Sequence, residues 1–102
     1  MGMLFMLTVW YPPHKGPDVM KKFVEATKTP LPSFIKKWQV YTTSDGERGV
    51  KSYHLIATEE GNVDEAAIYI AKSQVPFSEI EGYVHKIEPL LGVKDSFKVM
   101  GM

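Results

Sequence analysis

The chain has 102 residues, of which 44% are hydrophobic and 24% charged, a composition typical of one globular domain. Twelve basic and twelve acidic residues give a formal net charge of zero, so the basic excess of a nucleic-acid or anionic-membrane binder is absent. The chain has no cysteine, which excludes disulfides, thiol nucleophiles and thiolate metal sites, and without a signal-peptide pattern we expect a cytoplasmic protein.

The first predicted element is a strand over residues 4–11. Leu4-Phe5-Met6-Leu7-Thr8-Val9-Trp10-Tyr11 is a nearly unbroken apolar run, too short to span a membrane and typical of a strand covered on both faces. Its even and odd positions point to opposite sides of a sheet. One side can be covered by the chain's own helices, and we expect a second copy of the protein to cover the other. The sequence leaves open which side the helices cover.

A proline-rich loop and a helix follow the first strand. Three prolines and a glycine in residues 12–17 exclude a strand or helix there, while Pro17 suits a first helical position. Mostly apolar residues at three- and four-residue spacing then predict a helix that ends before residues 29–32. Its expected buried side consists of Val19, Met20, Phe23, Val24 and Thr27.

Two alternating strands are predicted over residues 35–43 and 50–58, joined by a hairpin loop with two glycines over residues 44–49. A second helix is predicted to begin at Asn62, which has Glu65 at the capping-box spacing, and to end before Pro76. Its expected buried side consists of Val63, Ala66, Ala67, Ile70 and Ala71.

The remaining residues allow two interpretations. Helical spacing is satisfied by Phe77, Ile80, Val84, Ile87 and Leu91. Gly82 and Pro89 disfavour that helix, so we favour an edge strand over residues 82–91, where a proline is tolerated. A short C-terminal helix would then be marked by Val93, Phe97 and Met100. In the alternative, Phe97 and Val99 belong to the last strand.

The elements predict one domain over residues 1–102 with the order strand, helix, strand, strand, helix, strand. With right-handed crossovers, this order predicts an α+β, ferredoxin-like βαββαβ fold whose antiparallel sheet has the order 4-1-3-2. The opening strand is then central, as its apolarity on both sides requires.

Three segments carry a resemblance to a known family: Leu4-Phe5-Met6-Leu7-Thr8-Val9-Trp10, Trp38 followed by Asp45-Gly46-Glu47-Arg48-Gly49, and Ile87-Glu88-Pro89-Leu90-Leu91. They resemble short prokaryotic domains of unknown function in the dimeric α+β barrel superfamily, whose best-known relatives are antibiotic-biosynthesis-type monooxygenases. The resemblance implies a homodimer in which two sheets stack through their helix-free faces. It implies no single reaction, since relatives include cofactor-free oxygenases, isomerases, haem-degrading enzymes and ligand binders. The haem-degrading branch matches poorly, because its iron-binding histidine lies on the second helix and residues 62–74 contain none.

His54 is the first candidate for chemistry. It lies mid-strand with Ser52 and Ile56 on the same face, and an imidazole can act as an acid or base near neutral pH. The alternative is a structural histidine bonded to a neighbouring hydroxyl or carbonyl. His14 and His85 are separated from His54 by 40 and 31 residues, spacings that match no metal-ligand motif, so we expect no metal site.

Aromatic residues are the second candidate. Trp10, Trp38, Tyr41 and Tyr53, together with His85, could line a slot for a flat, largely apolar ligand. Packing in the core or in a dimer interface is the alternative.

The first functional hypothesis is a homodimeric barrel that binds a small, largely apolar organic ligand, as a cofactor-free oxygenase or isomerase using His54. The second is a non-catalytic ligand-sensing or assembly domain. Neither needs a cofactor, a nucleic acid or a membrane.

Overall fold

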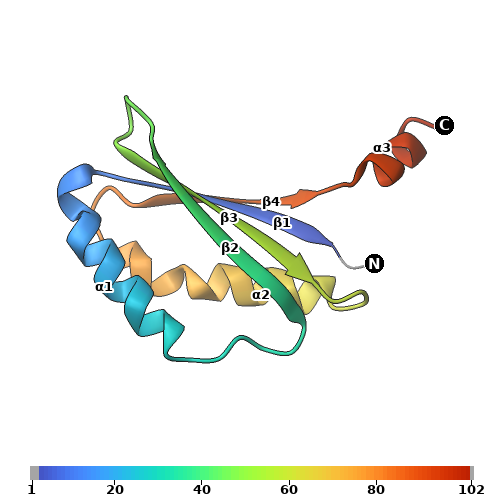
Figure 1. The fold of residues 1–102 in the computed structure, drawn as a ribbon, viewed down its shortest axis with the longest axis horizontal. Helices are drawn as coiled ribbons and strands as arrows, with labels where there is room; N and C mark the ends of the chain where they lie inside the picture. Colours follow the sequence, from blue (N-terminus) through green and yellow to red (C-terminus); the bar gives the residue numbers. More distant parts are fainter. Residues whose placement is uncertain (1–2, 102) are drawn as a thin grey trace.

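Two helices lie against one side of a four-stranded antiparallel sheet in the computed structural model, which describes residues 3–101 apart from the side chains of residues 93–95 (Figure 1). The strands are β1 (Leu4–Tyr11), β2 (Ile35–Ser44), β3 (Val50–Thr58) and β4 (Val84–Leu90). The α-helices are α1 (Gly16–Thr27), α2 (Val63–Ser73) and α3 (Val93–Val99), and the short 3₁₀ helices are η1 (Pro13–Lys15) and η2 (Val75–Glu79).

The sheet has the order β2-β3-β1-β4, with every neighbouring pair antiparallel. Counted from the β4 edge, the same neighbours read 4-1-3-2, and β1 lies between β3 and β4. This α+β arrangement is compatible with a ferredoxin-like fold, since each helix connects two strands that leave room for one antiparallel strand between them.

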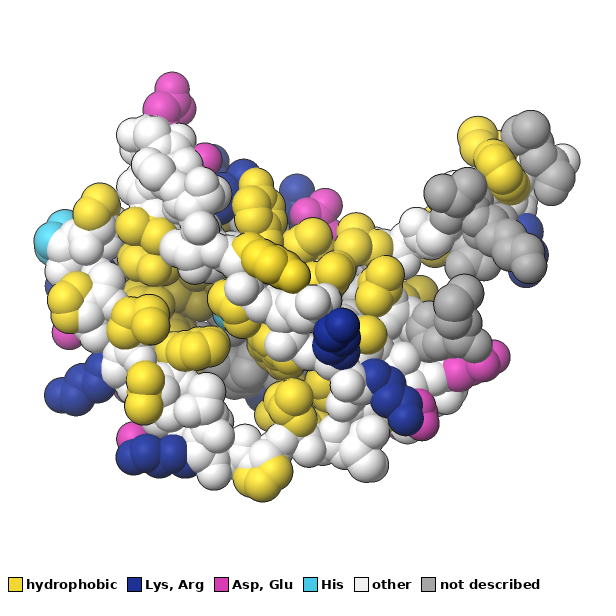
Figure 2. All heavy atoms as spheres, viewed as in Figure 1, with side chains coloured by type: hydrophobic (Ala, Val, Ile, Leu, Met, Phe, Trp, Pro, Cys, Tyr) yellow, Lys and Arg dark blue, Asp and Glu magenta, His cyan; other side chains and the backbone are white. Residues whose placement is uncertain are grey.

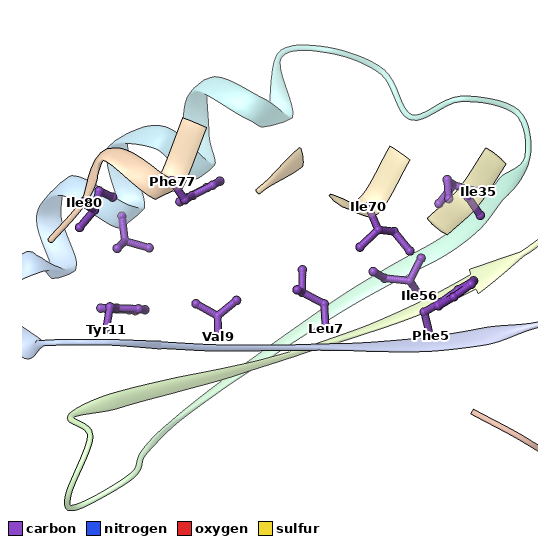
Figure 3. Close-up of a cluster of buried hydrophobic side chains, with 11 residues drawn as sticks. Phe5, Leu7, Val9, Tyr11, Ile35, Ile56, Ile70, Phe77 and Ile80 are labelled. Atoms are coloured by element: carbon purple, nitrogen blue, oxygen red, sulfur yellow. The ribbon is translucent and has the colours of Figure 1, made fainter. Parts of the chain in front are cut away.

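The two sides of β1 have different surroundings. Its odd positions point toward the helices and are buried (Figure 3). Because side chains alternate along a strand, its even positions point to the helix-free side of the sheet. We call the helix side the covered face, which begins with Phe5, Leu7, Val9 and Tyr11 of β1. The other side is the open face, which begins with Leu4, Met6, Thr8 and Trp10. The core is therefore built on the covered face, where Ile56 of β3 and Ile70 of α2 meet Leu7.

The corner after β1 is more ordered than the sequence indicated. Residues 12–17 were expected to be loop, but Pro13–Lys15 form η1 and α1 begins at Gly16. Prolines fit here because the first turn of a helix leaves its N–H groups unbonded. Pro12 also packs against Gly82, whose φ is +86°, so that a Cβ on Gly82 would lie 2.6 Å from Pro12 Cγ.

Helix α1 has a narrower buried side than predicted. Val19 is buried, but Met20 and Val24 are 53% and 54% exposed, and Thr27 is exposed as well. The spacing prediction was wrong for these three residues because α1 packs along its N-terminal part and leaves a space between the rest of the helix and the sheet. In α2, Ala66 and Ile70 are buried as expected, while Ala71 is exposed.

The predicted capping box of α2 does not form. Asn62 occupies the N-cap position but its side chain makes no capping hydrogen bond, and its backbone lies at φ −117° and ψ 31°. A capping side chain normally requires an extended backbone at this position, which explains the failure. Asp64 and Glu65 still lie in the first turn, where the helix dipole favours acidic groups.

The C-terminal part follows the favoured interpretation. Residues 84–90 form strand β4 at the sheet edge, which confirms the strand over the helix, and α3 follows. In Figure 1, α3 projects beyond the sheet, away from α1 and α2. Its residue Phe97 is exposed, and the side chain of Val93 lies outside the described residues. Within residues 3–101, no helix has the length and apolarity needed to cross a membrane.

Candidate functional site

A pocket of about 490 Å³ lies between α1 and the covered face of the sheet. Figure 2 shows hydrophobic side chains gathered in the hollow between α1 and the β2–β3 hairpin. The sheet contributes Val9, Tyr11, Trp38, Val40, Thr42, Ser52 and His54 to the pocket wall. The helices and connecting segments contribute Val19, Met20, Phe23, Ala26, Thr27, Thr29, Pro30, Leu31, Tyr69, Ser73, Gln74, Phe77 and Tyr83. The volume falls in the range of pockets that enclose small organic ligands.

Helix α1 is buried against the rest of the chain at Val19, near its start, whereas Phe23, Ala26 and Thr27 farther along the helix line the open space. Lys22 Nζ of α1 lies 3.1 Å from Glu79 Oε2 of η2. Beneath that end, Tyr83 stacks between Phe77 and Tyr11, with ring centroids 5.1 and 6.4 Å apart. These aromatic rings close one end of the pocket, and the side chains of β2 and β3 form its floor.

His54 and Trp38 form the central polar pair of the pocket floor. Trp38 Nε1 donates a hydrogen bond to His54 Nδ1 at 2.9 Å, and the two rings meet edge to face at 85°. An indole N–H can only donate, so Nδ1 must accept and carry no proton. A neutral imidazole with an unprotonated Nδ1 carries its proton on Nε2. Trp38 therefore fixes the tautomer of His54.

The second ring nitrogen of His54, Nε2, has no protein partner among the described residues. No buried side-chain nitrogen or oxygen of these residues lacks a partner. Nε2 thus keeps access to the open volume that His54 lines. The Nε2–H group is available to a molecule that enters the pocket.

Burial sets the charge state of His54. The loss of solvation lowers its pKa from 6.5 to about 4. The imidazole is therefore neutral at pH 7, and its ring offers a hydrogen-bond donor to the pocket while its lone pair is occupied by Trp38. This arrangement suits hydrogen-bond donation better than the acid–base role that the sequence suggested, because proton abstraction would need the lone pair.

Five other polar side chains of the pocket are bonded to one another in two groups. Thr42 Oγ1 and Ser52 Oγ lie 3.0 Å apart across β2 and β3. At the opposite wall, the Tyr83 hydroxyl donates to Gln74 Oε1 at 2.5 Å, and Gln74 Nε2 donates to Ser73 Oγ at 3.3 Å. Burial raises the pKa of Tyr83, so the phenol remains a neutral donor. None of the described residues that line the pocket is Lys, Arg, Asp or Glu.

The structure separates the residues that the sequence grouped into one slot. Trp38 and His54 meet in the pocket. Trp10, Tyr41 and Tyr53 lie on the open face, as the strand registers require. Trp10 instead contacts two cations, with Arg48 Cζ 4.9 Å and Lys51 Nζ 5.4 Å from its ring centroid. His85 faces the helix side opposite Val9, but it is exposed on the edge strand and does not line the pocket.

Several pocket residues carried no signal of their own in the sequence. Leu31 lies between Pro30 and Pro32 in the segment after α1, Gln74 follows the last residue of α2, and Ser52 is a small polar residue within β3. Strand parity correctly placed Ser52 on the face of His54 in β3, but the sequence did not single it out as a site residue. Leu31 and Gln74 depend on how the segments after α1 and α2 return to the sheet, which local sequence does not determine.

The histidines do not gather into a metal site. Within the part of the chain that the structure describes, no three His, Asp or Glu side chains are placed to hold one ion. His14 lies in η1 and His85 in β4, both exposed, whereas His54 is buried in β3.

Comparison with known proteins assigns no relative to this chain. No family model matches it, and no curated protein or solved structure is significantly similar to it.

Proposed function

We propose that this protein is a homodimeric α+β barrel, acting in the cytoplasm, that binds a small, largely apolar organic ligand in the pocket between α1 and the sheet. The observation that carries the proposal is a pocket of about 490 Å³ whose wall includes a neutral histidine with no protein partner on Nε2. Apolar walls supply affinity through burial, and one or two polar groups orient the bound molecule.

The homodimer is supported by what the open face presents to solvent. Leu4 and Met6 of β1 lie beside Ala57 and Leu55 of β3, and Leu4 also lies beside Leu90 of β4. These five residues make an apolar patch that no helix of the described chain covers (Figure 1). Contiguous exposed apolar surface of this kind is typical of protein interfaces.

The C-terminal helix adds to the same surface. Leu90 ends β4 at the end of the sheet where β1 begins, and α3 continues outward from there. Phe97, Val99 and Met100 are exposed on and just after α3. A second copy that stacks on the open face would give these side chains a surface to pack against.

A cofactor-free isomerase or oxygenase is the second candidate, and the Nε2–H group of His54 favours it. A fixed, desolvated donor can stabilise negative charge that develops on a substrate oxygen. Against it stands the lining of the pocket, in which no described residue is a carboxylate that could remove a proton. Ligand binding without catalysis, as in a sensing domain, is therefore the form of the proposal that we favour.

Binding at this pocket can be tested with two neighbouring positions on β2. Val40 lines the pocket, whereas Tyr41 points to the open face. We expect 2-acetylnaphthalene to bind the wild-type protein in a calorimetric titration, Val40→Trp to abolish binding by filling the pocket, and Tyr41→Trp to preserve it. Absence of binding to the wild-type protein, or equal binding by both variants, would contradict the proposal.

The dimer can be tested by placing a charge on the open face. We expect light scattering to find a dimer for the wild-type protein and a monomer for Leu55→Lys, because an unpaired charge in an interface is costly. Ile68→Lys is the matched control, since Ile68 is exposed on α2. A wild-type monomer over the whole accessible concentration range would refute the dimer.

A further inference from the structure

The walls of the pocket constrain the charge of its ligand. The described lining residues include no Lys, Arg, Asp or Glu, and the pKa of His54 is lowered to about 4. A ligand charge inside the pocket would lose solvation without gaining a counter-charge, which is unfavourable. An uncharged molecule avoids this cost.

The floor of the pocket constrains the polar group of the ligand. Trp38 occupies Nδ1 of His54 at 2.9 Å, so the ring can offer only its Nε2–H group to the pocket. This N–H needs an acceptor, and water would have to be held there if the ligand supplied none. Ser52, two residues away on the same face of β3, has its hydroxyl bonded to Thr42, and that pair can supply a second, adaptable donor beside the imidazole.

We infer that the pocket selects an uncharged ligand with a hydrogen-bond acceptor, of the ketone, aldehyde, ester or quinone class, whose oxygen accepts from Nε2–H of His54. This inference rests on the proposed ligand-binding function. It makes His54 a specificity-determining donor whose orientation and tautomer are set by Trp38. The apolar part of the ligand lies between Val40 on the sheet and Phe23 on α1, both of which line the pocket.

The test compares three naphthalenes that share one hydrocarbon skeleton. These are the ketone 2-acetylnaphthalene, the hydrocarbon 2-ethylnaphthalene and the anion 2-naphthoate, each titrated calorimetrically at neutral pH. We expect the carboxylate to bind at least about a hundredfold more weakly than the ketone, because its charge finds no partner. Equal affinities for the ketone and the carboxylate would overturn the inference.

The role of His54 is tested by His54→Phe, which keeps a planar ring and removes the donor. We expect a loss of about tenfold for the ketone and little change for the hydrocarbon, so the difference between the two ligands isolates the hydrogen bond. Equal losses for both ligands would overturn the inference. Val40→Trp tests the proposed function, because it fills the pocket. If Val40→Trp abolishes ketone binding and His54→Phe leaves it unchanged, the inference is contradicted but the proposed function is not. If none of the three compounds binds, both fail.

The tautomer has a readout that needs no ligand and no loss of the imidazole. In ¹⁵N NMR spectra of the wild-type protein at neutral pH, we expect the His54 ring to show a protonated Nε2 and an unprotonated Nδ1. Trp38→Phe removes the indole donor, and we expect it to weaken ketone binding while the hydrocarbon still binds. An unprotonated Nε2 in the wild-type protein would overturn the inference.

Discussion

The two faces of the sheet use the same strand in opposite ways. On the covered face, β1 presents Phe5, Leu7 and Val9 to α2 and η2, and all three are buried. On the open face, Met6 is half-buried and Trp10 lies under the cationic groups of Arg48 and Lys51. Apolarity alone therefore does not decide which side of a strand becomes the core. The helices close one face within the chain, and the other face is left for a different contact.

The largest effect is expected where the covered face is most tightly packed. Leu7 is 0% exposed, and Leu7→Ala should lower the free energy of unfolding by about 3 kcal/mol through lost burial and the cavity left behind. Met6→Ala, one residue away on the open face, should cost about 1 kcal/mol or less in an isolated subunit. Urea denaturation followed by circular dichroism measures both. Equal losses would show that the two faces of β1 contribute equally to stability, and a loss at Met6 that grows with protein concentration would support the dimer.

The next effect depends on pH and concerns a polar group in the covered face. The pKa of His54 is about 4 in the folded protein and 6.5 when unfolded, so the unfolded chain takes up its proton first as the pH falls. The contribution of His54 is therefore complete above about pH 6.5 and is lost toward pH 4, by up to roughly 3 kcal/mol.

Urea denaturation at a series of pH values measures this contribution. We expect His54→Phe to show a shallower loss of stability on acidification than the wild-type protein. His85→Gln is the control, because His85 is exposed on β4, and it should retain the wild-type slope. Parallel curves for all three proteins would show that His54 does not titrate as the buried geometry requires.

A smaller effect is expected at the corner that joins β1 to the helical layer. Gly82→Ala places a Cβ 2.6 Å from Pro12 Cγ at a positive φ of +86°, and we expect a loss of about 2 kcal/mol in unfolding free energy. Gly46→Ala is the matched control, because Gly46 has a φ of +77° with no atom within 4 Å of the new Cβ. It should cost only about 1 kcal/mol. Equal costs would mean that the contact with Pro12 contributes nothing.

The smallest effect is expected on the open face. Trp10→Leu removes the ring that Arg48 and Lys51 approach, and we expect a loss smaller than that of Gly82→Ala, because exposed cation–aromatic pairs are weak. Chemical denaturation of the monomeric Leu55→Lys background, with and without Trp10→Leu, separates this contact from any dimer contact. If Trp10→Leu lowered the free energy of unfolding as much as Leu7→Ala, the open face would contribute as much to stability as the covered face.

Periodicity was sufficient for most of the architecture. The unbroken apolar run of residues 4–11 correctly predicted a central strand, and alternation placed Trp38 and His54 away from Tyr41 in their strands. Gly82 and Pro89 correctly favoured a strand for β4, because neither residue suits a helix interior. These features depend on local sequence, so the spacing of apolar residues and the positions of glycine and proline are enough to predict them.

The remaining features depend on distant contacts. Phe5 and Met6 are both apolar, so nothing local indicated that the helices would cover the side of Phe5. The exposure of Val24 depends on the distance between α1 and the sheet. The helical spacing of apolar residues predicts which side of a helix faces the core, but not how far that side lies from the sheet. The bond between Trp38 and His54 depends on the register of β2 against β3, in which Trp38 pairs with Ile56 and Val40 with His54. The homodimer and the ligand stay predictions.

The bond from Trp38 to His54 has a consequence for the conditions under which the protein works. A histidine in water changes its charge near neutrality, and a receptor built on one responds to modest acidification. Here the indole and the surrounding side chains keep the imidazole in a single form from mildly acid to mildly alkaline surroundings. The affinity for an uncharged guest should stay constant across that span, so this histidine provides recognition that is insensitive to acidity.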